Sequence, residues 1–88
     1  MERRYYLPRV TERHYEAFRT LMGDRVHTTY AEWTEFMDFR RHDEAMRHPV
    51  VDVDVDPDEF AGFCRSSGYA FDYGTLVRYI SEKARHGI

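Results

Sequence analysis

The sequence predicts an α+β fold that is mostly helical, with four helices and a minor sheet of two short strands. Two patterns predict it: apolar residues recur at helical spacing in four segments, and valine alternates strictly with aspartate from Val51 to Asp56. The size of the chain limits the number of domains, because 88 residues of which 42% are apolar can bury one hydrophobic core but not two. We therefore expect residues 1–88 to form a single domain.

The first strand is expected at about residues 3–7. This run, Arg-Arg-Tyr-Tyr-Leu, is rich in side chains that favour strands, and it stops at Pro8. Because proline cannot donate a hydrogen bond to a neighbouring strand, we expect this strand at an edge of the sheet.

The first helix is expected at about residues 11–22. Thr11 offers an N-cap, and Gly23 can end the helix. Between them, one apolar stripe at helical spacing is formed by Tyr15, Phe18, Leu21 and Met22.

The second helix is expected at about residues 29–47, opened by a Thr29–Glu32 capping box and closed before Pro49. Its apolar side chains spread over roughly half of the circumference. They are Tyr30, Trp33, Phe36, Met37, Phe39 and Met46. Two interpretations stay open: a helix central in a monomer, or a helix partly covered by a second copy, in which case Trp33, Phe36 and Phe39 would mediate self-association.

The valine run predicts the second strand at about residues 50–55, with its valines on one face and its aspartates on the other. It leads into a third helix at about residues 57–67. Asp56 is a suitable N-cap, Pro57 suits the first helical position, and Gly68 can end the helix. The last helix is expected at about residues 75–86.

The linker between the last two helices holds three aromatic residues within five positions: Tyr69, Phe71 and Tyr73. They either insert into the core or form an exposed contact surface, since aromatic residues dominate interface hot spots. We include them among the candidate partner-binding residues.

Five acidic residues lie within eight positions, from Asp52 to Glu59. Asp56 and Glu59 are accounted for by helix capping, which leaves Asp52, Asp54 and Asp58 as candidate residues for binding a basic partner. An EF-hand loop is excluded, because the positions that need glycine and glutamate hold Pro57 and Phe63.

Two other interpretations of the acidic stripe remain. Asp52 and Asp54 could share Mg²⁺ or Mn²⁺ in a metal-dependent hydrolase, but the sequence identifies no further ligand and no phosphate-holding base. Alternatively, the stripe pairs with the arginine-rich N-terminus of the same chain, through Arg3, Arg4 or Arg9. The second interpretation makes these acids structural.

No cofactor fingerprint, metal-ligand spacing or nucleophile–base set is recognisable. Cys64 is expected to be a buried structural residue, since it lies one turn after Phe60 on the apolar side of its helix. Among the histidines, His27 is the best functional candidate, because it lies in a loop. We therefore assign no catalytic residue, no metal and no cofactor.

The net charge is −3, and the excess of acid lies wholly in residues 48–88. This balance argues against nucleic acid as a partner, although Arg78, Lys83 and Arg85 on the last helix leave a DNA-binding regulator as an alternative. No apolar run is long enough to span a membrane, so we expect a soluble cytoplasmic protein. The leading expectation is a protein-interaction or regulatory module, with itself or a basic protein as its partner.

Overall fold

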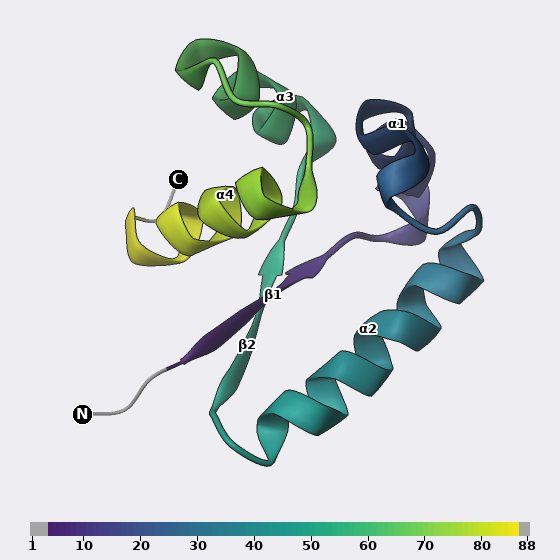
Figure 1. The fold of residues 1–88 in the computed structure, drawn as a ribbon, viewed down its shortest axis with the longest axis vertical. Helices are drawn as coiled ribbons and strands as arrows, with labels where there is room; N and C mark the ends of the chain where they lie inside the picture. The colour runs from purple at the N-terminus through teal and green to yellow at the C-terminus, as the bar shows by residue number, and fades with distance from the viewer. Residues whose placement is uncertain (1–3, 87–88) are drawn as a thin grey trace.

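The computed structural model describes residues 4–86, and its elements follow the order β-α-α-β-α-α (Figure 1). The elements are β1 (Tyr5–Arg9), α1 (Glu12–Met22), a 3₁₀ turn (Gly23–Arg25), α2 (Tyr30–Ala45), β2 (Val50–Asp54), α3 (Pro57–Ser67) and α4 (Tyr73–His86). Four helices and a two-stranded sheet within this range confirm the predicted fold class. No helix within residues 4–86 is both long and apolar enough to cross a membrane.

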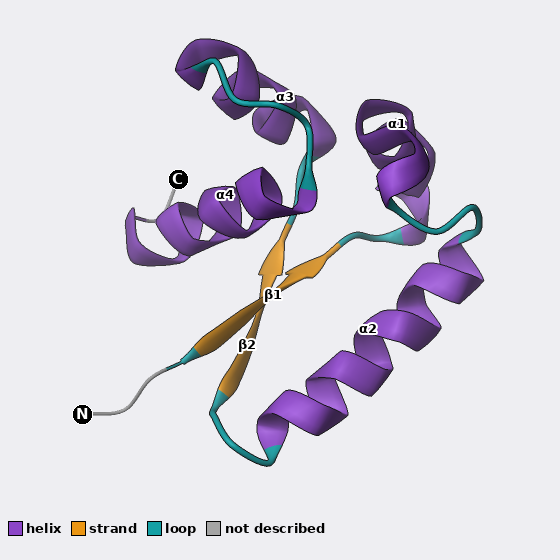
Figure 2. Ribbon diagram, viewed as in Figure 1, coloured by secondary structure: helices purple, strands orange, loops and turns teal. Residues whose placement is uncertain are grey.

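The two strands are parallel, with Tyr5 opposite Val50 and Arg9 opposite Asp54. A parallel pair needs a long crossover connection, and α1 and α2 supply it. In Figure 2 the strands lie at the centre of the molecule, with α2 on one side and α4 on the other. Both of these helices contact both strands.

β1 begins and ends two residues later than expected and includes Pro8. The amide of Tyr5 bonds the Pro49 carbonyl, and the carbonyl of Arg9 accepts from Val55, both at 2.9 Å. Because alternate residues of a strand face the same neighbour, the nitrogen of Pro8 faces away from β2, where no donor is needed. Arg3, included in the expected strand, lies outside the described residues.

β2 ends at Asp54, one residue before the expected end, but its valines and aspartates face opposite sides as predicted. Val53 and Val55 are buried, whereas Asp52 and Asp54 are exposed. The core into which the valines point is built from all four helices and both strands, and its largest fully buried side chains include Phe18, Phe60, Leu76 and Tyr79. Cys64 is also in this core, and burial raises the pKa of its thiol, as expected for a structural cysteine.

α3 has the predicted bounds, because both of its ends are determined locally. The Asp56 carboxylate accepts from the amides of Asp58 and Glu59 at 2.9 and 3.3 Å. At the other end, Gly68 takes a left-handed conformation with φ of 71° and closes the helix.

α1 and α4 differ from expectation at one end, and α2 differs at both ends. α1 and α2 start one residue after their capping threonines, and α2 ends two residues early, at Ala45. α4 starts two residues early, at Tyr73, because the carboxylate of Asp72 accepts from the Thr75 amide at 2.8 Å, as an N-cap does. Tyr73 is therefore part of a helix and not of the linker.

Thr29→Ala is expected to lower the free energy of unfolding by about 1 kcal/mol. The Thr29 hydroxyl accepts from the Glu32 amide at 3.1 Å, and the Glu32 carboxylate accepts from the Thr29 amide at 3.2 Å. Thr11 is the matched control, because it precedes α1 without any capping bond from its side chain. In urea denaturation, Thr11→Ala should change stability by less than about 0.5 kcal/mol; equal losses in both variants would contradict the capping role.

Candidate interaction surface

α2 presents apolar side chains on two different sides. Trp33 and Met37 are 2% and 3% exposed and point into the core, whereas Phe39 and Met46 are each 72% exposed. Phe36 lies between these extremes at 37%. At helical spacing, one side of the helix and its C-cap residue Met46 present a set of exposed or half-buried side chains, which we call the outer face of α2: Glu32, Glu35, Phe36, Phe39, Asp43 and Met46.

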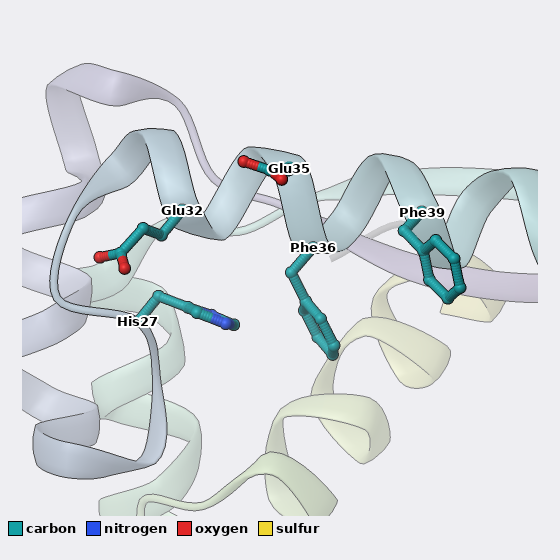
Figure 3. A pocket seen from close by; sticks show the side chains of 5 residues that line it. All are labelled: His27, Glu32, Glu35, Phe36 and Phe39. Atoms are coloured by element: carbon teal, nitrogen blue, oxygen red, sulfur yellow. The ribbon is translucent and has the colours of Figure 1, made fainter.

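An open hollow of about 390 Å³ lies at the N-terminal half of this face (Figure 3). Its lining residues are His27, Glu32, Glu35, Phe36 and Phe39. In Figure 3 the rings of Phe36 and Phe39 extend from the same side of α2, and His27 extends toward Phe36 from the preceding loop. The ring centroids of His27 and Phe36 are 5.0 Å apart. The hollow is therefore lined largely by aromatic rings: those of Phe36 and Phe39 on α2 and that of His27 in the preceding loop.

The apolar residues of the outer face are edged by carboxylates. Glu32 completes the capping box with one oxygen, and Asp43 lies 3.4 Å from the Arg47 guanidinium. Within residues 4–86, Glu35 forms no ion pair. The outer face therefore combines large apolar groups with an acidic border.

His27 is held in place by its neighbours on both sides. Its carbonyl accepts a hydrogen bond from the Tyr15 hydroxyl, and its ring lies 6.5 Å from that of Trp33. Its Nδ1 atom is buried and has no hydrogen-bond partner among the described residues. The sequence pointed to His27 only through its place in a loop, and the structure adds that it forms a wall of the hollow.

Trp33 belongs to the core and has no surface to offer a partner. Its ring packs against Phe18 at 5.3 Å and Tyr15 at 5.9 Å between centroids. Of the three residues predicted to mediate self-association, only Phe36 and Phe39 reach the surface. Sequence reasoning left Met46 and Glu35 out of this set, although their spacing along the helix could have included them.

The acidic stripe is neutralised by arginines of the same chain. Asp54 pairs with Arg9 at 2.6 Å, which confirms one of the predicted pairings. Asp52 pairs instead with Arg41 of α2, at 2.6 Å to one nitrogen and 3.2 Å to another. Arg4 forms no ion pair within residues 4–86, and Arg3 lies outside that range. These two carboxylates are thus occupied, which weakens the case for a basic partner or a divalent cation at the stripe.

The surroundings of Asp54 also shift its titration. The hydrogen bond from Arg9 holds the pKa of the Asp54 carboxyl below its usual value. Among residues 4–86, no group of three His, Cys, Asp or Glu side chains is arranged to hold a metal ion. Asp58 is exposed and lines a separate hollow with residues of α1 and α3, so its contact with a partner stays a prediction.

Asp52→Ser combined with Asp54→Ser is expected to lower the free energy of unfolding by about 0.5–2 kcal/mol, since exposed ion pairs contribute up to about 1 kcal/mol each. The loss should be largest at low salt, because salt screens these pairs. Asp58→Ser is the control, since Asp58 forms no ion pair within residues 4–86. Unchanged or raised stability of the double variant would contradict a structural role.

The three aromatic residues after α3 have different environments. Phe71 packs edge-on against Phe60 at 6.0 Å, and Tyr73 is largely covered, so that burial raises the pKa of its hydroxyl. Tyr69 is exposed but lies under the Arg78 guanidinium, 4.9 Å from its ring centroid. Phe71 and Tyr73 therefore belong mainly to the core, and Tyr69 is the one with most surface to offer.

The basic residues of α4 are partly occupied within the chain. Arg78 covers Tyr69, and Lys83 lies 3.1 Å from the Glu59 carboxylate and 2.8 Å from the Asp54 carbonyl. These contacts reduce the positive charge that α4 could present to DNA.

Compared with known proteins, the chain matches no family model, no curated protein and no solved structure. Its function is therefore inferred from the geometry of this molecule alone.

Proposed function

We propose that this protein is a protein-interaction module and that it binds its partner through the outer face of α2. The observation that carries the proposal is the 72% exposure of both Phe39 and Met46 on one face of a well-capped helix. Removing exposed apolar side chains from water at a contact with a partner is energetically favourable. Aromatic and methionine side chains are also the types enriched in protein interfaces.

The shape and charge of the face indicate the chemistry of the partner. The hollow beside Phe36 suits one bulky apolar side chain, which is how interface anchors usually bind. Glu32, Glu35 and Asp43 border the apolar residues and favour basic groups on the partner. A suitable partner surface therefore has an apolar centre and presents basic or hydrogen-bond-donating side chains to these carboxylates.

The environments of the residues best suited to catalysis favour a binding role over a catalytic one. Cys64 is 1% exposed, and burial raises the pKa of its thiol, so it is poorly placed to act as a nucleophile. Asp52 and Asp54 are each held by an arginine. Phe39 and Met46 of the outer face of α2 have no such contacts within residues 4–86 that would account for their exposure.

Site-specific photo-crosslinking in cells that express the protein tests the proposal. A photoreactive phenylalanine analogue at position 39 should yield covalent adducts with a protein partner. The same analogue at position 77 is the matched control, because Val77 is an exposed apolar residue on a different helix, α4. Adducts from position 39 that exceed those from position 77 are the expected result.

Equal or absent adducts at the two positions would overturn the proposal. The mass of each adduct also shows whether the partner is a second copy of this chain or another protein. Either partner supports the proposed function, because both require a contact at the outer face of α2.

A further inference from the structure

We propose that the outer face of α2 is covered by α2 of a second copy of this chain, packed antiparallel with Phe39 at the two-fold axis. This inference rests on the proposed function and names the partner. It is carried by the spacing of the apolar residues along α2 and by the order of the charges on either side of them.

The spacing of residues on the outer face suits a helix pair centred on Phe39. Met46, the C-cap residue in helical conformation, lies seven residues after Phe39, and Glu32 lies seven residues before it, so the three form one line along the helix. α2 has 16 residues and is about 24 Å long, enough for a contact of four turns. Antiparallel packing places residue 32 of one copy opposite residue 46 of the other.

This arrangement fills the hollow of each copy. Met46 of the second copy comes to the N-terminal half of α2, where His27, Glu32 and Phe36 line the hollow. Methionine is unbranched and flexible and fits irregular apolar spaces well. The two Phe39 side chains meet at the centre, and each hollow receives the exposed methionine of the other copy.

The charges favour the antiparallel orientation. On one edge of the pair, Glu35 lies opposite His42 of the second copy, whose imidazole can donate a hydrogen bond to a carboxylate. On the other edge, Glu32 lies near both Asp43 and Arg47 of the second copy, and the Arg47 guanidinium, 3.4 Å from Asp43, is placed between the two carboxylates. In a parallel pair, each glutamate would lie beside its own equivalent, and like charges at an interface are unfavourable.

The groups on these edges are accessible in the single chain. Glu35 and His42 are exposed and form no ion pair within residues 4–86. The Arg47 side chain is 59% exposed although it contacts Asp43 and Glu44 at 3.4 and 3.6 Å. Each can therefore meet a second copy without breaking the core.

Sedimentation equilibrium of the purified chain tests the proposal. At high micromolar concentration the wild type should sediment at twice the 10.6 kDa mass of one chain. Phe39→Ser should sediment at the single mass and keep the wild-type circular dichroism spectrum. Val77→Ser, the matched control on α4, should remain dimeric.

A pair of charge reversals tests the orientation. His42→Glu places a new carboxylate opposite Glu35 of the second copy and should raise the dissociation constant at least about tenfold. Adding Glu35→Lys should restore the dissociation constant to within about threefold of wild type, because opposite charges then meet again. In a parallel pair the added lysine would meet its own equivalent and no recovery would follow.

Three results would overturn this inference: a wild type that stays at the single mass, a dimer that Phe39→Ser leaves intact, or no recovery in the double variant. None of them removes the proposed function. Adducts from position 39 to another protein, together with a monomeric wild type, would retain the function and assign the surface to a different partner.

Discussion

Trp33→Ala is expected to lower the free energy of unfolding by about 3–5 kcal/mol, the range for removing a buried aromatic side chain. The Trp33 side chain is 2% exposed and contacts the rings of Tyr15 and Phe18, so truncation leaves a cavity between α1 and α2. Total stabilities of small domains are about 5–15 kcal/mol, and the variant should be close to unfolded at physiological temperature. Urea denaturation followed by far-ultraviolet circular dichroism measures the loss.

Phe39→Ala is the matched control on the same helix. Because the Phe39 side chain is 72% exposed, its removal should change the unfolding free energy of the single chain by less than about 0.5 kcal/mol. Both variants should be measured at a low concentration, at which self-association makes no contribution. Similar losses in the two variants would mean that the two sides of α2 are not divided into core and surface.

Tyr79→Ala is expected to lower the free energy of unfolding by about 3–5 kcal/mol, because it too removes a buried aromatic side chain. The Tyr79 ring packs against Phe60 at 5.4 Å and Phe63 at 5.7 Å, and its hydroxyl donates to the Glu59 carboxylate. Tyr79→Phe removes only the hydroxyl and should lower the free energy of unfolding by about 1–2 kcal/mol. The loss is smaller because the Glu59 side chain is 43% exposed, so water partly replaces the lost donor. A Tyr79→Phe loss as large as that of Tyr79→Ala would contradict this division.

The same pair predicts how stability depends on pH. Burial, followed by the hydrogen bond to Glu59, raises the pKa of Tyr79 above its ordinary value of 10.0. A group with a raised pKa in the folded state contributes its stability below its unfolded pKa and loses it as the pH rises further. The difference in stability between wild type and Tyr79→Phe should therefore shrink above pH 10, and a difference that grows there would contradict the account.

At low pH the group that titrates is Glu59, the acceptor of the hydrogen bond from Tyr79. The bonds from Tyr79 and Lys83 lower the pKa of Glu59, so its contribution is present above the ordinary value of 4.5 and is lost as the pH falls through the folded-state pKa. Tyr79→Phe weakens this dependence because it removes the largest cause of the shift. Urea denaturation at a series of pH values measures both effects.

Local signals in the sequence were sufficient for most of the fold. The bounds of α3 follow from Asp56, Pro57 and Gly68, which act on their own backbone neighbours and need no knowledge of the tertiary structure. The start of α4 was missed because Gly74 weakens helical propensity at the point where Asp72 caps the helix. Local capping outweighed propensity there.

The surface contacts depended on information that the sequence does not carry. The Arg9–Asp54 pair was predictable, because Arg9 belongs to the arginine-rich N-terminal segment that includes the expected first strand, and Asp54 belongs to the expected second strand. The Arg41–Asp52 pair depends on how α2 packs beside β2, which no local pattern encodes. In the same way, the wide apolar arc of α2 was visible, but only packing shows that Trp33 faces the core and Phe39 faces solvent.

Nuclear magnetic resonance of the methionine methyl groups tests most directly whether a second copy covers the outer face of α2. Met46 is 72% exposed in the single chain, whereas Met22 and Met37 are buried and serve as internal controls. As the protein is concentrated, the Met46 methyl resonance should move along a dimerisation curve while those of Met22 and Met37 stay in place. A Met46 resonance that stays constant up to high micromolar concentration would contradict the antiparallel α2 pair.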